Sequence, residues 1–181
     1  RPGTNLFQRV FLVWRDLPVP VIAAIHGHCL GAGMQLALGA DFRIATPDSQ
    51  LAIMEARWGL VPDMGITATL RGLIGLDMAK ELTMTARIIS GTQAKEIGLV
   101  SHVAQEPMIK ALELANEIGA RSPDAVLAAK RVLNAMVSQP ESDTLALEKR
   151  WQRRLMLGKN FKIAGKKAKT PELDFVDREF D

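Results

Sequence analysis

The stretch Val19–Asp41, VPVIAAIHGHCLGAGMQLALGAD, determines how the first part of this chain is expected to fold. It starts as an apolar run rich in β-branched residues and breaks at His26. It then passes through Gly31 and Gly33 into a helical pattern that ends near Gly39. A buried strand, a glycine turn and a helix start place several backbone N–H groups around one point, where they can hold negative charge on a ligand. The stretch therefore predicts half of an oxyanion hole.

The composition is that of an ordinary soluble globular protein. The 181 residues are 48% hydrophobic and 24% charged, which is enough for one sizeable core and an appendage. The net charge of +3 is too small to indicate nucleic acid or a membrane as the partner. The single cysteine, Cys29, excludes an internal disulfide framework and suits a reducing compartment. We therefore expect a cytoplasmic protein.

The first forty residues show neither a cleavable signal nor a membrane span. Residues 6–17 carry Arg9, Arg15 and Asp16, which a signal sequence would not tolerate. Residues 19–40 lack Asp, Glu, Lys and Arg, but their histidines, glutamine and glycines suit a strand, turn and helix better than a bilayer. The chain opens without Met and enters an amphipathic helix almost at once, so we expect an N-terminal portion of the fold to be absent.

Hydrophobic patterning divides the chain into an α/β part, residues 1–104, and a helical part with a basic tail, residues 105–181. The continuous apolar run of the first strand is typical of a parallel sheet covered on both faces. In the α/β part, helices are expected over 5–17, 33–40, 66–74, 77–85 and 92–97, and strands over 21–26, 42–45, 50–54 and 100–103. In the helical part, helices are expected over 108–121, 123–138 and 141–157.

The glycine turn by itself leaves two interpretations open. A GxG after a strand can bind a dinucleotide, but here the spacing is Gly27-x-x-x-Gly31-x-Gly33, and no acidic residue ends a second strand. The glycines can equally serve close packing of helix on strand.

Two carboxylates are candidates for proton transfer. Glu55 follows an apolar strand, and Asp63 lies in an otherwise uncharged loop. Glu55 could be a surface residue at a strand end, and Asp63 could cap the helix that follows. Two acids in neighbouring apolar loops near an anion hole are also what proton transfer next to a thioester or ketone needs.

Two other groups of residues receive a structural interpretation. His26, His28 and Cys29 lack further zinc ligands or a base partner nearby, so they are interpreted as packing or turn residues, and no metal is expected. The tail lysines have poor aromatic interleaving, which favours a solvated helical face over nucleic-acid binding. Those lysines are Lys159, Lys162, Lys166, Lys167 and Lys169.

Several segments together resemble the crotonase superfamily, the enoyl-CoA hydratase/isomerase family. The first segment is PVIAAIHGHCLGAGMQ, residues 20–35, followed by LALGADFRIA, residues 36–45. The resemblance continues through LAIMEARWGLVPD, residues 51–63, and through ELTMTAR and GLVSHV, residues 81–87 and 98–103. It covers roughly residues 10–103 and extends into the helices up to residue 138.

The resemblance implies a spiral of ββα units followed by a C-terminal helical region that builds trimers, often paired into hexamers. It also implies an acyl-CoA substrate whose thioester oxygen is held by two backbone N–H groups, with coenzyme A as part of the substrate and no separate cofactor. The position of one donor matches Ala32. The other donor belongs to an earlier loop that this sequence lacks. Gly31, Gly33 and His28 are the expected substrate-binding neighbours of Ala32.

The acid/base positions of the hydratases fall on Gln35 and Glu55. Gln35 departs from the family pattern, because an amide exchanges no proton at neutral pH, although it can hold a water or steady a carboxylate. Asp63 matches a position where dienoyl-CoA isomerases place an aspartate, yet those enzymes also carry an acid at the Gln35 position. The resulting hypothesis is an enoyl-CoA isomerase with Glu55 as principal acid/base, Asp63 as the second and Gln35 as positioner.

Three rival functions follow from the same residues. The first is an enoyl-CoA hydratase that works with one glutamate. The second is an RNA-binding relative that uses the basic tail, and the third is a dinucleotide enzyme. The last two rank well below the first, and no membrane partner is expected.

Overall fold

The computed structural model describes residues 3–181, which form two compact units. The first unit contains residues 3–17 and 21–113, and the second contains Pro18–Pro20 and Leu114–Asp181. The division falls inside helix α6 (Pro107–Gly119), later than the boundary drawn from sequence after residue 104. The short proline segment before the first strand belongs with the C-terminal helices.

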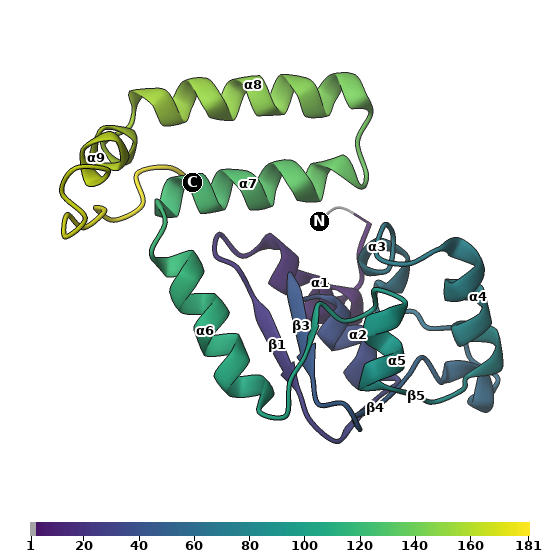
Figure 1. Cartoon of the computed structure of the whole chain (residues 1–181). Coiled ribbons are helices and arrows are strands. Elements are labelled where there is room, and N and C mark those ends of the chain that lie inside the picture. The colour runs from purple at the N-terminus through teal and green to yellow at the C-terminus, as the bar shows by residue number, and fades with distance from the viewer. Residues whose placement is uncertain (1–2) are drawn as a thin grey trace. The chain divides into compact units, whose positions relative to one another are not determined.

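The described strands of the first unit form two three-stranded sheets (Figure 1). One sheet has the order β1-β3-β6 and is parallel throughout. The other has the order β2-β4-β5, with β2 parallel and β5 antiparallel to β4. Strands β1 to β4 alternate between the two sheets, and helices follow β2 and β4, as in the expected crotonase-like spiral of ββα units. The strands are β1 (Ile22–Ile25), β2 (His28–Leu30), β3 (Phe42–Ala45), β4 (Gln50–Ala52), β5 (Ile89–Ser90) and β6 (His102–Val103).

Two helices of the first unit begin with a capping box. Asn5 and Gln8 form one at the start of α1, and Ser90 and Gln93 form one at the start of α5. A short 3₁₀ helix, η1, follows β4 directly. The helices are α1 (Leu6–Asp16), α2 (Ala32–Leu38), η1 (Glu55–Trp58), α3 (Ile66–Thr69), α4 (Leu76–Thr85) and α5 (Gly91–Glu96).

Three expectations from the sequence are wrong, and one short strand was not foreseen. The segment read as a turn around His28 is the strand β2, and the two-residue β5 was not foreseen. The helix expected over 66–74 ends at Thr69, because Gly72 adopts a φ of +77°, which interrupts a right-handed helix. Strand β1 is buried only at Ile25, because it lies at a sheet edge rather than between covering layers.

The core of the first unit lies between α2 and the two sheets. Its fully buried side chains come from both sheets, from α2 and from the segment before β6. Met34 and Leu38 of α2 share this cluster with Ile53 and Leu99. The helix that carries the glycine turn is therefore fixed by burial along one side.

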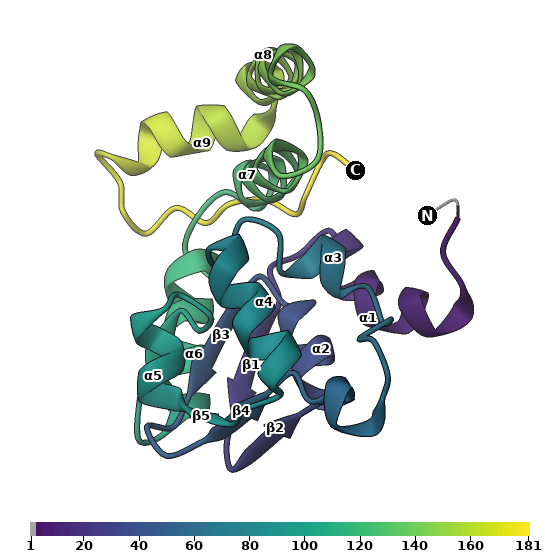
Figure 2. The same ribbon diagram turned by 90° about the vertical axis from the view of Figure 1, so that its right-hand side faces the viewer.

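The second unit is built on α7 (Pro123–Met136), α8 (Glu141–Leu157) and α9 (Lys159–Lys167). Helices α7 and α8 lie side by side in both views (Figures 1 and 2). Leu127 and Trp151 form the centre of its apolar cluster. The C-terminal segment returns to α7, where Asp124 accepts hydrogen bonds from Asn160 Nδ2 at 2.7 Å and from the backbone N–H groups of Glu179 and Phe180 at 2.8 and 3.1 Å. Among the described residues, no helix is long and apolar enough to cross a membrane.

Candidate active site

The start of α2 presents backbone N–H groups, as the sequence predicted. Gly31 precedes the helix with φ +52° and ψ −118°, a conformation that favours glycine, and its N–H donates to Ala52 O at 2.9 Å. The first intrahelical bond is Gln35 N–H to Gly31 O at 3.0 Å, so the amides of Ala32 and Gly33 precede the helical ladder. Ala32 and Gly33 are exposed. Their N–H groups can therefore reach an oxygen on a ligand.

Glu55 lies beside this helix start. Parallel pairing of Leu30 with Ala52 brings the residue after β2 next to the segment after β4. A Cβ added to Gly31 would lie 3.8 Å from Glu55 Oε1 and 3.5 Å from Met54 Cγ. The carboxylate and the candidate N–H donors are therefore neighbours, although Glu55 comes 24 positions after Gly31 in the chain.

Gln35 connects Glu55 to the loop that contains Asp63. Its Nε2 donates to Glu55 Oε1 at 2.6 Å, and its Oε1 accepts from Met64 N–H at 3.0 Å. Gln35 itself is 1% exposed. The two candidates Gln35 and Glu55 thus form one hydrogen-bonded pair, and the backbone of Met64 is a partner that sequence reasoning missed. Backbone partners leave no residue-type signal in a sequence.

The second oxygen of Glu55 has no protein partner. Glu55 Oε2 is buried and makes no hydrogen bond among the described residues. A buried carboxylate oxygen without a donor is costly, so in native structures such atoms usually meet a ligand or ordered water. This atom argues against the alternative that Glu55 is a surface residue at a strand end.

Asp63 is placed differently from Glu55. Asp63 is exposed and lies in the loop between η1 and α3. The N-cap of α3 is Gly65, without a side-chain capping bond, so the alternative that Asp63 caps this helix is wrong. Its neighbour Met64 contacts Gln35 through the backbone, but within residues 3–181 no hydrogen bond or ion pair joins Asp63 to Glu55.

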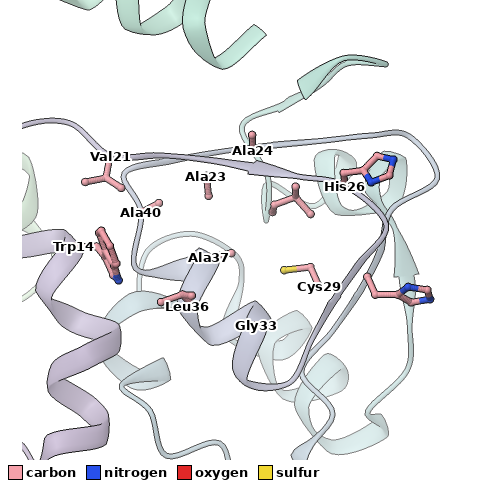
Figure 3. A pocket seen from close by; sticks show the side chains of 12 residues that line it. Trp14, Val21, Ala23, Ala24, His26, Cys29, Gly33, Leu36, Ala37 and Ala40 are labelled. Carbon is pink, nitrogen blue, oxygen red and sulfur yellow. The ribbon is translucent and has the colours of Figure 1, made fainter. Parts of the chain in front are cut away.

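A pocket of about 380 Å³ lies between β1, β2 and α2 (Figure 3). His28 and Gly33, two of the predicted substrate-binding residues, line it together with apolar side chains. Trp14 and Leu36 lie at one end and His26 lies at the other, as Figure 3 shows. His28 and Gly33 therefore line the same pocket. In the part of the chain described, His28 makes no hydrogen bond to Gln35 or Glu55.

Cys29 packs in the core, whereas His26 lies in the turn between β1 and β2. Burial raises the pKa of the Cys29 thiol to about 11, and its Sγ lies 3.9 Å from Met34 Sδ. His26 and His28 are exposed, and in β2 the side chain of His28 points away from the side on which Cys29 is buried. Within residues 3–181, no three His, Cys, Asp or Glu side chains lie close enough together to hold a metal.

Arg43 supports the C-terminal end of α2 from strand β3. Its guanidinium is buried and donates to Leu99 O at 2.9 Å and to Ala40 O at 2.8 Å. Burial lowers its pKa to about 10, against the opposing effect of Asp41. The same Asp41 accepts from Val21 N–H at 2.8 Å. A lone arginine in an otherwise apolar strand was the available signal for this anchor.

The tail lysines lie mostly on an exposed helix, as predicted. Helix α9 carries most of them, and Lys162, Lys166 and Lys169 are exposed. Lys159 pairs with Glu179 at 3.6 Å, and Lys167 donates to the carbonyls of Pro171 and Leu173. Part of the positive charge is thus used within the second unit.

Residues 4–172 match the family described as enoyl-CoA hydratase/isomerase. YngF of Bacillus subtilis, a provisionally named enoyl-CoA hydratase/isomerase, is 43% identical over 150 residues, which cover 82% of this chain and 58% of YngF. The crystal structure of an enoyl-CoA hydratase from Bacillus anthracis superposes with a TM-score of 0.90 at 33% identity, over 99% of this chain and 74% of that one.

A third relative was solved with a ligand. It is a provisionally named enoyl-CoA hydratase from Thermobifida fusca in complex with acetoacetyl-CoA, with a TM-score of 0.76 at 34% identity. The superposition covers 81% of this chain and 58% of that one. The chain therefore belongs to the enoyl-CoA hydratase/isomerase family of the crotonase superfamily, and it spans little more than half the length of YngF.

Proposed function

We propose that the protein isomerises the double bond of an enoyl-CoA, as in fatty-acid β-oxidation, by proton transfer next to an enolised thioester. The observation that carries this proposal is the position of Glu55 beside the N–H groups at the start of α2. A base and an anion-stabilising helix start, side by side, supply the two elements of enolate chemistry. Family membership supports an acyl-CoA substrate.

The proposed mechanism uses the residues in distinct roles. The thioester oxygen lies at the Ala32 N–H, with Gly31 and Gly33 shaping the approach and His28 lining the neighbouring pocket. Negative charge that develops on this oxygen during enolisation is stabilised there, and one such donor is typically worth about 3 kcal/mol in the transition state. Glu55 removes the proton and is the principal acid/base.

The Gln35–Glu55 pair favours isomerisation over hydration. Hydration requires one group to activate water while another delivers a proton at the α-carbon, and the amide of Gln35 can do neither. Asp63 is proposed as the second acid/base, which requires its exposed carboxylate to reach the substrate. The alternative is a hydratase that works with Glu55 alone, which the hydratase relatives from Bacillus anthracis and Thermobifida fusca support.

Further expectations come with this function. The complex of the Thermobifida fusca relative with acetoacetyl-CoA supports coenzyme A as the carrier within the substrate. We expect no additional cofactor. We expect a homotrimer or a dimer of trimers built through the C-terminal helices, and a cytoplasmic location. RNA binding ranks lower, since Lys159 and Lys167 are engaged within the second unit.

A panel of acyl-CoA substrates tests the proposal on the full-length protein. Each 2-enoyl-, 3-enoyl- and dienoyl-CoA is scored separately for water addition and for double-bond shift. The proposal predicts double-bond shift as the main reaction, reduced in Asp63→Asn. Water addition faster than double-bond shift would establish the one-glutamate hydratase instead.

A further inference from the structure

The segment that joins the two candidate acids exposes three large apolar side chains. Trp58, Leu60 and Val61 lie between Glu55 and Asp63 and are 74%, 64% and 74% exposed. Single exposed apolar residues are common on a protein surface, but a contiguous group usually marks a site that binds a ligand or a partner. Tryptophan in particular is largely buried in most proteins. This group beside the candidate site therefore indicates a surface that an apolar ligand covers.

The 3₁₀ helix η1 places Trp58 one turn from Glu55 on the same side. The helix runs over Glu55–Trp58, and residues i and i+3 of a 3₁₀ helix are eclipsed. At a rise of about 2 Å per residue, the two residues are separated by roughly 6 Å along the helix axis. The turn is held by hydrogen bonds from Arg57 N–H to Met54 O and from Leu60 N–H to Glu55 O, both at 3.1 Å. The backbone of Trp58 is therefore fixed next to the candidate base.

The same segment continues into an apolar hollow lined from α3 and α4. Val61 and Pro62 line this hollow, which has a volume of about 490 Å³. Ile66, Leu70 and Met84 are among the other apolar side chains that line it. Small-molecule sites usually have volumes of about 300–1,000 Å³ and mainly apolar walls. The hollow is therefore large enough for several methylene groups beyond Trp58.

We propose that residues 58–61 receive the hydrocarbon chain of the acyl group and give the protein a preference for long acyl chains, with Trp58 as the main determinant. A substrate with its thioester at the start of α2 and its reacting carbon at Glu55 extends its remaining chain past Trp58, the neighbour of Glu55 on η1. Removing this chain from water stabilises the complex. The inference rests on the proposed function and adds to it the class of acyl group.

Binding of unreactive saturated acyl-CoAs to the full-length protein tests the inference without turnover. Each methylene group that leaves water contributes a factor of about four in affinity, so the wild type should bind octanoyl-CoA on the order of 10²-fold more tightly than butyryl-CoA. Trp58→Ala should lower this ratio by on the order of tenfold, mainly through weaker binding of octanoyl-CoA. An unchanged ratio in Trp58→Ala, or equal affinity of the wild type for both ligands, would overturn the inference.

Met108→Ala is the matched control, because Met108 is 60% exposed on α6 in the same unit. This variant should keep the affinity ratio of the wild type. Since both side chains are exposed, neither substitution should change the melting temperature appreciably. An equal fall of the ratio in both variants would overturn the inference, because Met108 lies outside the segment.

Tryptophan fluorescence locates the bound chain. Octanoyl-CoA should shift the emission of the wild type to shorter wavelength, because Trp58 leaves water, and the shift should be absent in Trp58→Phe. A shift that persists in Trp58→Phe, or no shift of the wild type at saturation, would contradict the proposed place of the chain.

The proposed function can fail separately from this inference. Acyl-CoAs that bind with the expected dependence on Trp58 but undergo no double-bond shift would contradict the proposed function and leave the chain-binding role of Trp58 intact. Double-bond shift with a chain-length preference that Trp58→Ala does not alter would overturn the inference alone.

Discussion

Two carboxylates of this protein, Glu55 and Asp124, are both held by side-chain amides but are satisfied to different degrees. Asp124 is 1% exposed, and each of its oxygens accepts at least one hydrogen bond, from Asn160, Glu179 or Phe180. Glu55 receives one bond on Oε1, from Gln35, and none on its buried Oε2. The two residues lie in different compact units.

The difference separates a structural acid from the acid proposed to act in catalysis. Every donor around Asp124 belongs to the chain itself, so its charge holds the C-terminal segment to α7. Glu55 keeps a buried oxygen without a donor among the described residues, which is costly for a carboxylate. The following predictions test this contrast.

The largest expected effect is on catalysis, in Glu55→Gln. Losing the base should lower the rate of double-bond shift by about 10²–10⁴-fold. The melting temperature should change little, because the amide occupies the same volume and can still accept from Gln35. Parallel kinetics and thermal unfolding measure both. Wild-type rates in this variant would place the chemistry elsewhere.

The second effect is on stability, in Asp124→Ala. This substitution removes the Asp124 acceptor from the N–H groups of Glu179 and Phe180 and from the amide of Asn160. The free energy of unfolding should fall by about 3 kcal/mol. Urea unfolding measures this loss, and hydrogen exchange should accelerate at Glu179 and Phe180.

The matched control is Asp143→Ala, since Asp143 is an exposed acid in the first turn of α8. Losing its interaction with the helix dipole and its exposed hydrogen bond from Ser142 Oγ should cost about 0.5 kcal/mol. Equal losses from Asp124→Ala and Asp143→Ala would contradict a structural role that depends on the saturated shell of Asp124.

A smaller effect is expected in Gly31→Ala, at the border of the Glu55 site. The positive φ of Gly31 makes any side chain unfavourable by about 1–2 kcal/mol. The new methyl also faces Met54 and Glu55, so kcat should fall together with stability.

Gly165→Ala is the control, since Gly165 lies within α9 and a Cβ added there would meet no atom within 4 Å. It should be neutral or stabilising. Loss of stability without loss of kcat would show that the helix start does not shape the site.

The smallest effect concerns Cys29, a buried group with no charged partner. Because its pKa is raised to about 11, the thiol should react negligibly with Ellman's reagent at pH 8 and faster as pH approaches 11. The same shift favours the folded state below the unfolded pKa of 9.0, and this contribution is lost as pH rises towards about 11. Rapid modification at pH 8 in folded protein would show that the side chain is accessible.

Local sequence signals predicted most of the helices and strands. They failed for strands whose formation depends on pairing with a distant part of the chain. Helix α5, whose N-cap is Ser90, and the strand Phe42–Ala45 follow from neighbouring residues, and both elements were predicted. Strands β2 and β5 are two or three residues long and exist because they pair with β4. Their pairing partners lie too far away in the chain for a local pattern to show them.

The candidate site shows the same division. Spacing and residue type were enough to single out Glu55, Gln35 and the glycines around Ala32. The hydrogen bond that Gln35 accepts from Met64 N–H could not be predicted from the sequence, because a backbone N–H is present at every residue except proline. The exposure of Asp63 and the burial of Glu55 Oε2 likewise depend on what packs around each carboxylate.

The sequence by itself determined the family, the ββα pattern and the acid that follows β4, because these depend on residue types at fixed spacing. Only the tertiary structure decided that Gln35 and Glu55 form a pair and that one oxygen of Glu55 is buried without a hydrogen bond among the described residues. A hydrogen bond depends on distances of a few tenths of an ångström between segments that the sheet pairing brings together. The segments around the glycine turn identify the family, and the contacts of Glu55 show how the candidate acid is held.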